Sequence, residues 1–540
     1  MSSAAVATPP RKGRLGSRIK SNGGCLTCKI RKVKCGEEKP ACLRCSSTGR
    51  KCEGYVNAIN SREQPPAASA SPTLAHVGCI SSYAHASRLE VQAFEFFMSD
   101  VLPGFSRIVD QHFWHQVIPQ LSQSDKIIWD AVNALSCLIR HPQISWRWLL
   151  PGPKASTLAD DNHRLAVKWY SKSLHGLQKR MTHGSVSPGM LMVTCLLYIS
   201  IECLQDNLDG AMVLYYRALA MNNMLAEKGA GNYSTTAARD VGSVEGTVQS
   251  LLRHMSISKE LPASLRKVNS HINMTFDSLS EIREEGYLLL DEVHGFLEHI
   301  DGIRSIMPKA WLPTPDLIEW WEKVRNRIRF LETAIQEVVK RQRRAISECP
   351  DEDELYSTLM LSFNHFYVVV SSSVSMYQTT LDEFMAQFRS IIAYIRRVVA
   401  IQRRRSRRPV FVFETRILPA LYYVATKCRH PLIRREAIFL LENEAPRMEY
   451  IAKAEGMAAV AKRIVGIEEA CGSEEGVFCA EWPPHKADLL PAEDHRVYRE
   501  RLTELVDATS GEPVHFLEYG IWRREGDGGV WTPTEHIVKM

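Results

Sequence analysis

Six cysteines of the 540-residue chain lie close together in the sequence, between positions 25 and 52. The gaps among the first three recur among the last three, which gives C-x2-C-x6-C-x6-C-x2-C-x6-C. Thiolates at such short, regular spacing are ligands that structural zinc prefers. The other eight cysteines lie singly in apolar or mixed sequence, and no secretion signal is recognisable, so the cluster predicts a metal site rather than disulfides. Its members are Cys25, Cys28, Cys35, Cys42, Cys45 and Cys52.

The number of ligands sets the metal content that this segment can hold. Tetrahedral zinc takes four ligands, so a single ion would leave two cysteines idle and break the repeat. Two ions need eight ligand positions, which six cysteines supply only if two of them bridge both metals. No histidine lies among them, the nearest being His76. We therefore expect two Zn2+ ions, whose binding drives the folding of a segment too small for an apolar core.

Basic residues are concentrated around these cysteines. Residues 1–60 contain 13 Lys and Arg against three acidic residues, a net charge of +10, whereas the whole chain carries +6 and the remainder therefore −4. Such a distribution is typical of a segment that contacts a polyanion. The gap between Cys28 and Cys35 reads KIRKVK. The basic run at residues 11–20 fits a nuclear-import signal, a phosphate-contacting arm or a solvated tail.

Residues 25–52 resemble the DNA-binding domain of the fungal zinc binuclear cluster transcription factors, in cysteine spacing, in the basic first gap and in Pro40 of the middle loop. The resemblance implies that the helix of the first half reads a CGG-type half-site in the major groove. It implies base contacts by Arg31 and Lys32, whose side chains can donate to O6 and N7 of guanine. It also implies that Cys25 and Cys42 are the bridging ligands.

Other basic side chains of the segment are expected to contact phosphates, which position a domain without reading sequence. They are Lys29, Lys34, Arg44, Arg50 and Lys51. Gly36 stands where the family usually has Asp, a turn position that glycine also suits. The alternatives for the cysteines are a zinc ribbon, a chance cysteine-rich tail, or an iron–sulfur site, although iron–sulfur patterns use other spacings.

The rest of the chain must position this segment, and its pattern is mostly α-helical. We expect a basic disordered arm at 1–19, the two-zinc cluster domain at 20–56, a flexible linker at 57–86, a large all-helical regulatory domain at 87–470 and an irregular C-terminal segment at 471–540. The linker is rich in Ala, Ser and Pro and shows no a/d heptad pattern, so the sequence predicts a monomer or a dimer formed through the helical body.

Apolar residues at helical spacing mark the buried faces of three helices. Further helical stretches are expected at 190–226, 276–302, 315–347, 382–404 and 431–466, and one strand near 514–522. The run at 190–201 is too short to span a bilayer and predicts a buried core helix. The three faces are Val91, Phe94, Met98, Val101; Ile128, Ala131, Leu135, Leu138; and Leu165, Trp169, Tyr170, Leu174, Leu177.

Two parts of the body also resemble the regulatory region of the same family. The first contains GFSRIVDQHFWHQVIPQLS and ALSCLIRH, and the second RHPLIRREAIFLLENEAPRMEYIAKAEG and IVGIEEA. His112 and His115 are expected to pack around their aromatic neighbours rather than bind metal. The run RRRSRR at 403–408 is interpreted as a solvated helix end rather than an import signal or a phosphorylation site. The acidic stretch at 468–494 fits an activation segment or a loop.

Together these features predict a nuclear, sequence-specific DNA-binding transcription regulator of RNA polymerase II promoters, with double-stranded DNA and the transcription machinery as partners and no membrane. An enzyme is the second hypothesis, but the sequence contains no GxxxxGK[ST], GxGxxG, HExxH or GxSxG motif. A zinc-dependent adaptor that binds protein or RNA is the third, and the dense basic gap favours duplex DNA over it.

Overall fold

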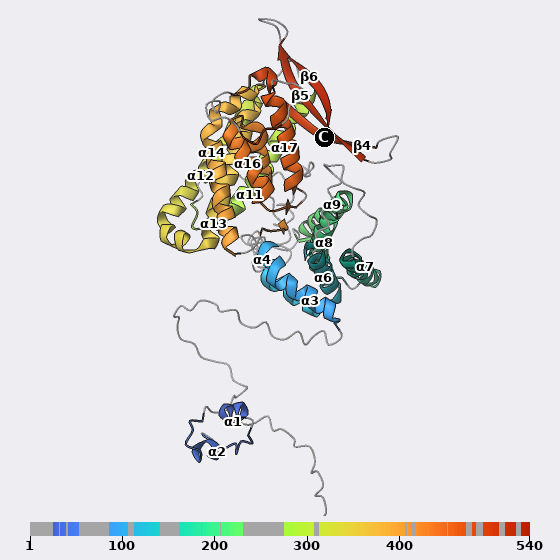
Figure 1. Cartoon of the computed structure of the whole chain (residues 1–540), viewed down its shortest axis with the longest axis vertical. Helices are drawn as coiled ribbons and strands as arrows, with labels where there is room; N and C mark the ends of the chain where they lie inside the picture. The colour runs from blue at the N-terminus through green and yellow to red at the C-terminus, as the bar shows by residue number, and fades with distance from the viewer. Residues whose placement is uncertain are drawn as a thin grey trace, which may run out of the picture. The chain divides into compact units, whose positions relative to one another are not determined.

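The structure, a computed structural model, divides the chain into two compact units, Met1–Cys79 and Ile80–Met540 (Figure 1). It describes residues 25–31, 33–38, 41–52, 86–105, 113–140, 161–184, 186–205, 207–229, 275–306, 313–405, 408–412, 416–450, 452–470, 478–481, 490–506, 513–524 and 531–540. The described part of the first unit contains two short helices, α1 (Leu26–Ile30) and α2 (Leu43–Ser46). Each helix begins directly after the first cysteine of its half.

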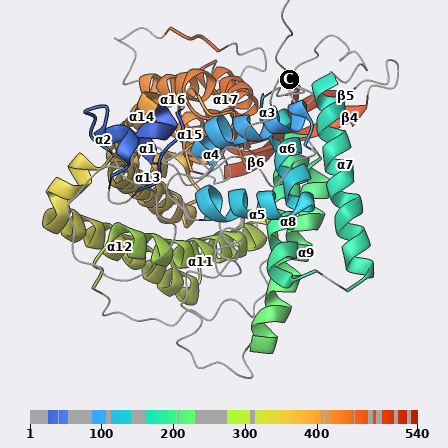
Figure 2. The same ribbon diagram turned by 90° about the horizontal axis from the view of Figure 1, so that it is seen from below.

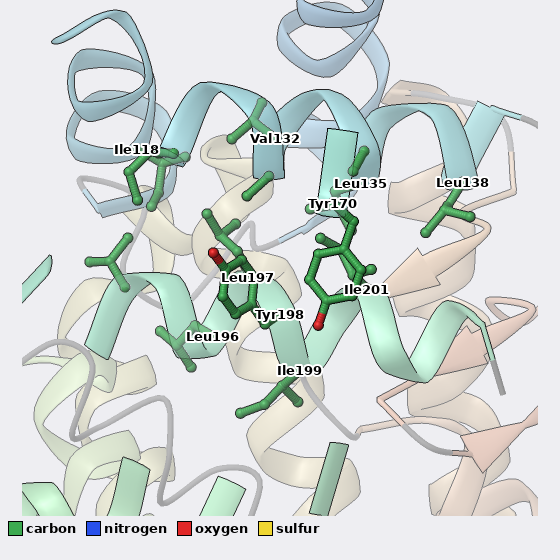
Figure 3. Close-up of a cluster of buried hydrophobic side chains, with 14 of the residues drawn as sticks. Ile118, Val132, Leu135, Leu138, Tyr170, Leu196, Leu197, Tyr198, Ile199 and Ile201 are labelled. Atoms are coloured by element: carbon green, nitrogen blue, oxygen red, sulfur yellow. The ribbon is translucent and has the colours of Figure 1, made fainter. Parts of the chain in front are cut away.

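The second unit begins with a helical layer built around two buried helices. Its elements are α3 (Arg88–Phe96), the π-helix η1 (Phe97–Val101), α4 (Leu102–Phe105), the π-helix η2 (Phe113–Val117), α5 (Ile118–Ser124), α6 (Lys126–Arg140), α7 (Asp161–Thr182), α8 (Pro188–Leu204) and α9 (Leu208–Gly229). Figure 3 shows side chains of α6 such as Leu135 facing α8 residues such as Leu197. Because α6 and α8 are apolar on most sides, the other helices pack around them.

A second group of helices follows in the chain and forms two further hydrophobic clusters. It comprises α11 (Leu279–Ile306), α12 (Pro315–Glu348), α13 (Pro350–Ser373), the 3-10 helix η5 (Gln378–Phe384), α14 (Met385–Arg405), α15 (Leu418–Lys427), α16 (Pro431–Asn443) and α17 (Ala454–Glu469). Figure 2 shows α11 and α12 side by side, as their shared buried residues require. Three short strands lie among these helices: β1 (Phe411–Val412), β2 (Met448–Glu449) and β3 (Ala452–Lys453), in the order β1-β2-β3.

The C-terminal residues form an antiparallel sheet in the order β4-β5-β6. After the 3-10 helix η7 (Glu493–His495), the strands are β4 (Val497–Val506), β5 (Pro513–Arg524) and β6 (Trp531–Lys539). Leu517, Tyr519 and Ile521 of the central strand pack with Ile464 and Ile467 of α17. These side chains alternate along β5, so one face of the sheet is buried against the helix.

The mostly α-helical prediction is confirmed, and so is the burial of residues 190–201, which lie in α8. Among the described residues, no helix combines the length and the apolar character that a membrane crossing demands. Two predicted stretches are interrupted: 190–226 comprises α8 and α9, and 431–466 comprises α16, β2, β3 and α17. The strand predicted near 514–522 is confirmed as part of β5, whereas the expectation that the rest of 471–540 is irregular was wrong for residues 497–506 and 531–539, which form β4 and β6.

The predicted helix faces are correct except at a few positions. The residues expected on α6 are all buried, as are Phe94, Val101, Trp169, Tyr170 and Leu177, while Val91, Met98 and Leu165 are half-buried. Leu174 was placed in the core but is 40% exposed. Ser173 is buried in its place, with its hydroxyl donating to the Ile127 carbonyl at 2.7 Å.

The structure also bears on three smaller predictions, which concern the histidines at 112 and 115, the basic run at 403–408 and the acidic stretch at 468–494. His115 is exposed beside buried Phe113 and Trp114, so its packing around the aromatics stays a prediction, and His112 lies outside the described residues. The prediction that residues 403–408 are a solvated helix end is wrong for Arg408. Its guanidinium donates to the carbonyl oxygens of Leu441, Glu442 and Ala445. In the stretch 468–494, Glu468 is fully buried, and residues 471–477 and 482–489 lie outside the described part.

Candidate metal centre and nucleic-acid interface

The six predicted ligands converge on one point of the first unit. Their Sγ atoms form two groups of four, each with all members within 4.8 Å of one another. One group is Cys25, Cys28, Cys35, Cys42, and the other is Cys25, Cys42, Cys45, Cys52. Four sulfurs at this separation are what a tetrahedral zinc requires. The two groups share Cys25 and Cys42, the pair that the resemblance implied as bridging.

The backbone around the sulfurs repeats between the two halves. The Cys25 amide donates to Cys35 Sγ at 3.3 Å, and the Cys42 amide donates to Cys52 Sγ at 3.4 Å. In each half the first cysteine therefore holds the third in place across ten positions. A further hydrogen bond, from the Thr27 hydroxyl to the Lys51 carbonyl at 3.3 Å, joins the first half to the end of the second. The 17-residue sequence repeat is thus also a structural repeat.

The chemistry of the donor set fits zinc. Cys25, Cys28, Cys42 and Cys45 are fully buried, and Cys52 is half-buried. Burial raises the pKa of the Cys25 and Cys28 thiols and raises the pKa of Cys45 to about 12. Because thiolate is the form that binds metal, these sulfurs need a cation close by to exist as thiolates at neutral pH. The six sulfurs form two tetrahedral sites that have two ligands in common, and these sites provide room for two divalent ions.

Comparison with known proteins agrees with this geometry. Residues 23–62 match the fungal Zn(2)-Cys(6) binuclear cluster domain. The segment is a fungal zinc binuclear cluster domain. Its cofactor is a pair of zinc ions, held by the six cysteines that the structure brings together. The chain thus has a cluster of the kind found in the fungal zinc cluster transcription factors that it resembles.

Several fungal transcription regulators match part of this chain. The aspercryptin biosynthesis cluster-specific transcription regulator atnN of Emericella nidulans is 55% identical over 49 residues, which cover 9% of this chain and 8% of that protein. Zn(2)-C6 fungal-type transcription factor afumD of Aspergillus fumigatus is 34% identical over 24% of this chain and 35% of its own. Transcription regulator lscL of Purpureocillium lilacinum is 27% identical over 34% of this chain and 44% of its own. The chain therefore spans less than half the length of each, and no solved structure matches it.

The structure places five of the seven basic side chains that were predicted to contact DNA. Arg31 follows α1 directly and is half-buried, with its backbone amide bonded to the Thr27 carbonyl at 3.2 Å. Lys32 lies outside the described residues, as does the side chain of Lys29 in α1. The four other predicted phosphate contacts have exposed side chains: Lys34, Arg44, Arg50 and Lys51.

The sequence analysis missed the polar link between the two halves. The Glu38 carboxylate accepts a hydrogen bond from the Leu43 amide at 3.0 Å, at the first residue of α2. A Cβ atom at Gly36 would clash with Glu38 Oε2, so a side chain at position 36 requires this carboxylate to move. Glu38 lies five residues before Leu43, outside both the N-cap and the first turn of α2, so no local sequence signal marked this contact.

Proposed function

We propose that the chain is a sequence-specific DNA-binding transcription regulator that reads CGG-type half-sites through its zinc binuclear cluster domain. The observation that carries the proposal is the pair of overlapping four-sulfur groups that share Cys25 and Cys42. They fold a short basic segment around metal, next to α1 and the KIRKVK gap. The printed names of the matching relatives, all transcription regulators or transcription factors, support the same function.

The proposal assigns roles to the basic residues. Arg31 and Lys32 donate to guanine O6 and N7 in the major groove, because Arg and Lys make the commonest specific contacts to this base. Lys29, Lys34, Arg44, Arg50 and Lys51 contact phosphates and set the register of the domain on the duplex. The exposure of four of these five side chains supports that role.

Quantitative binding of the full-length, zinc-loaded chain tests the proposal. Fluorescence anisotropy would compare a CGG-containing duplex, a scrambled duplex and a single-stranded RNA. Each good base contact contributes about 1–3 kcal/mol of discrimination. Arg31→Ala and Lys32→Ala should therefore weaken binding to the CGG duplex about 5- to 150-fold more than binding to the scrambled duplex. The control is Lys539→Ala, an exposed lysine at the C-terminal end of β6.

Two results would overturn the assignment. If Lys32→Ala lowered affinity for both duplexes by one factor, Lys32 would not read bases. If the wild-type chain bound the RNA as tightly as the CGG duplex, an RNA-binding adaptor would replace the DNA-binding regulator.

The proposal extends to the domain organisation and the cellular context. Residues 20–56 form the DNA-binding domain, 57–86 a linker, and 87–470 a regulatory domain that acts on RNA polymerase II promoters in the nucleus together with the transcription machinery. Without a coiled coil after the cluster, the chain binds as a monomer or dimerises through its helical body. Deletion of residues 57–86 should then leave the oligomeric state unchanged in light scattering, and loss of a dimer would refute this.

A further inference from the structure

Two arginines of α12 converge on one tyrosine of α13. The guanidinium of Arg325 donates to the Tyr367 hydroxyl oxygen at 3.3 Å, and the guanidinium of Arg329 donates to the same oxygen. The two arginines are four positions apart on α12, so their side chains lie one turn apart on the same side of the helix. Arg329 is exposed, and Arg325 and Tyr367 are half-buried, so the three groups meet at the surface of the body.

The two arginines have no carboxylate partner within 4 Å in the part of the chain that the structure describes. Glu322 and Glu332, which lie one turn to either side of them on α12, form no ion pair with them. Arg327 shows the contrast, because it lies between the two in the sequence and pairs with Glu285 and Glu292 of α11. The neighbouring arginine is therefore neutralised, whereas Arg325 and Arg329 bring two positive charges to one oxygen.

An aromatic stack accounts for only one of these charges. The guanidinium carbon of Arg325 lies 4.1 Å from the ring centroid of Trp321, and the Trp321 indole nitrogen is held by the Val370 carbonyl at 2.8 Å. Arg329 adds a second cation at 4.9 Å from the Tyr367 ring, which already has Arg325 at 5.7 Å. Two cations at one ring repel each other, so a role in stacking does not explain Arg329.

The effect of the two charges is visible at Tyr367. Burial by itself raises the pKa of the Tyr367 hydroxyl, but the hydrogen bonds from Arg325 and Arg329 and their charges outweigh it and hold the pKa below its ordinary value. The surroundings of this oxygen therefore favour negative charge.

We infer that Arg325, Arg329 and Tyr367 form a binding site for the phosphate group of a small molecule. A guanidinium has only donors, and a phenol that accepts from two of them still has its own proton to donate. The three groups can therefore donate together to one oxyanion, in charge-assisted hydrogen bonds of the strong kind. The inference concerns the helical body and is independent of the DNA-binding function proposed for the zinc domain.

Charge favours phosphate over carboxylate at this site. A phosphate monoester carries about −1.5 to −2 at pH 7, which matches the two arginines. A carboxylate would leave one of the two positive charges unmatched. Inorganic phosphate and an organic phosphate monoester share the required chemistry, and binding experiments can distinguish them.

Calorimetric titration of the full-length, zinc-loaded chain with inorganic phosphate at constant ionic strength tests the site. Phenyl phosphate, sulfate and acetate are the matched probes. Acetate should bind at least about tenfold more weakly than phosphate or sulfate, because a monoanion forgoes one of the two charge-assisted contacts. Tighter binding of phenyl phosphate than of inorganic phosphate would identify an organic monoester as the ligand, and the reverse order would identify the free ion.

Variants locate the binding. Arg329→Gln should weaken phosphate at least about tenfold, since hydrogen bonds to a charged group are among the stronger ones. Arg329→Lys should recover part of the loss, because lysine keeps the charge but not the planar fork of donors. Tyr367→Phe removes the phenol donor and should weaken phosphate as well. The control is Arg501→Gln, an exposed arginine of β4, and circular dichroism should be unchanged in all four variants.

The pH dependence separates the dianion from other causes. The second pKa of a phosphate group is about 6, so phosphate binding should weaken between about pH 7.5 and about pH 5, whereas sulfate stays a dianion and should not weaken. The inference is overturned if Arg329→Gln binds phosphate like the wild type, or if acetate binds as tightly as sulfate. Loss of duplex binding in Arg329→Gln, with phosphate binding unchanged, would assign the arginine to DNA instead.

Discussion

The Sγ atoms of Cys25 and Cys42 lie 3.6 Å apart, although 17 positions separate the two residues in the sequence. Each is the first cysteine of its half, and each belongs to both four-sulfur groups. The same two residues also donate their backbone amides to the third cysteine of their own halves. Their position at the centre of the cluster makes them unequal to the other four ligands, which leads to the first prediction.

Removing a shared ligand should affect both metal positions. Native mass spectrometry should find two zinc ions in the wild-type chain. Cys25→Ser or Cys42→Ser should lose zinc from both positions, whereas Cys52→Ser removes a ligand from one group only and should keep one ion. The control is Cys479→Ser, because Cys479 is an exposed cysteine outside the domain. A single zinc in the wild type would contradict the bridged cluster.

The salt dependence of binding should distinguish lysines that contact phosphate from lysines that contact bases. Each neutralised phosphate steepens the dependence of log K on log salt by about 0.9. Lys29→Ala or Lys34→Ala should therefore reduce this slope by about 0.9, the contribution of one phosphate. Each variant should weaken binding to the CGG duplex and to the scrambled duplex equally. Zinc content should stay at two ions, because neither residue is a ligand. Isotherms at several salt concentrations measure the slope, and a loss confined to the CGG duplex would assign base reading to that lysine.

Glu468 is the centre of a buried ion-pair network. Its carboxylate accepts from Arg429 at 3.0 Å, from Arg434 at 2.6 Å and from the Val497 amide at 2.9 Å, and all three charged side chains are fully buried. Removing one partner of a buried pair costs about 3–5 kcal/mol. Glu468→Ala should lower the free energy of unfolding by that amount in urea titrations. Glu319→Ala, which breaks an exposed pair with Lys323, should leave it unchanged within error.

The same network sets an acid limit on stability. Burial by itself raises the pKa of Glu468, but the two arginines and the Val497 amide outweigh it and hold the pKa below its usual value. A lowered pKa gives stability that is full above the unfolded value of about 4.3 and is lost as the pH falls through the folded value. The difference in unfolding free energy between wild type and Glu468→Ala should therefore shrink below about pH 4.3. A constant difference would contradict the ionised state of Glu468.

Glu449 should show the opposite pH dependence. It is buried in β2 and accepts hydrogen bonds from the backbone amides of Arg416, Ile417 and Leu418, at the start of α15. Burial raises the pKa of Glu449 despite these donors. A raised pKa gives stability that is full below the unfolded value and declines as the pH rises through the folded value. Wild type should therefore gain stability relative to Glu449→Gln as the pH is lowered.

The two substitutions of Glu449 separate capping from charge. Glu449→Ala leaves buried amides without an acceptor, which costs about 1–3 kcal/mol. Glu449→Gln retains a carbonyl oxygen and should cost less at neutral pH. Urea titrations of both variants measure the difference. Equal losses would show that a neutral carbonyl oxygen at position 449 does not replace the hydrogen bonds that the carboxylate accepts at the helix start.

The metal centre was predictable because its chemistry is local. Ligand type and spacing alone determined which cysteines meet, and the structure brings the same six together. The helix break between α8 and α9 was also readable, since Asn207 accepts from the Gly210 amide as an ordinary N-terminal cap. Pro446, within the interrupted stretch 431–466, gave a similar signal.

Other features depend on contacts that no local pattern contains. Helix α13 was missed because its buried residues lie on nearly all sides, which removes the amphipathic period. Leu174 is exposed and Ser173 is buried in its place. The Ser173 hydroxyl can be buried because it forms hydrogen bonds with the Ile127 carbonyl and the Tyr198 hydroxyl, which are distant in the sequence. Strands β4 and β6 are edge strands of mixed composition, and pairing with β5 gives them their conformation.

The last strands have a consequence for truncated forms of the protein. Glu468 of α17 accepts from the Val497 amide, and Arg496 pairs through both nitrogens with Asp382 of η5. A premature stop codon before residue 490 would thus remove the strands. It would also take Arg496 from Asp382 and the Val497 amide from Glu468, and it would expose apolar α17 side chains to water. Such a product should be a substrate for cellular quality control rather than a shortened regulator, and its steady-state abundance would fall before any question of DNA binding arises.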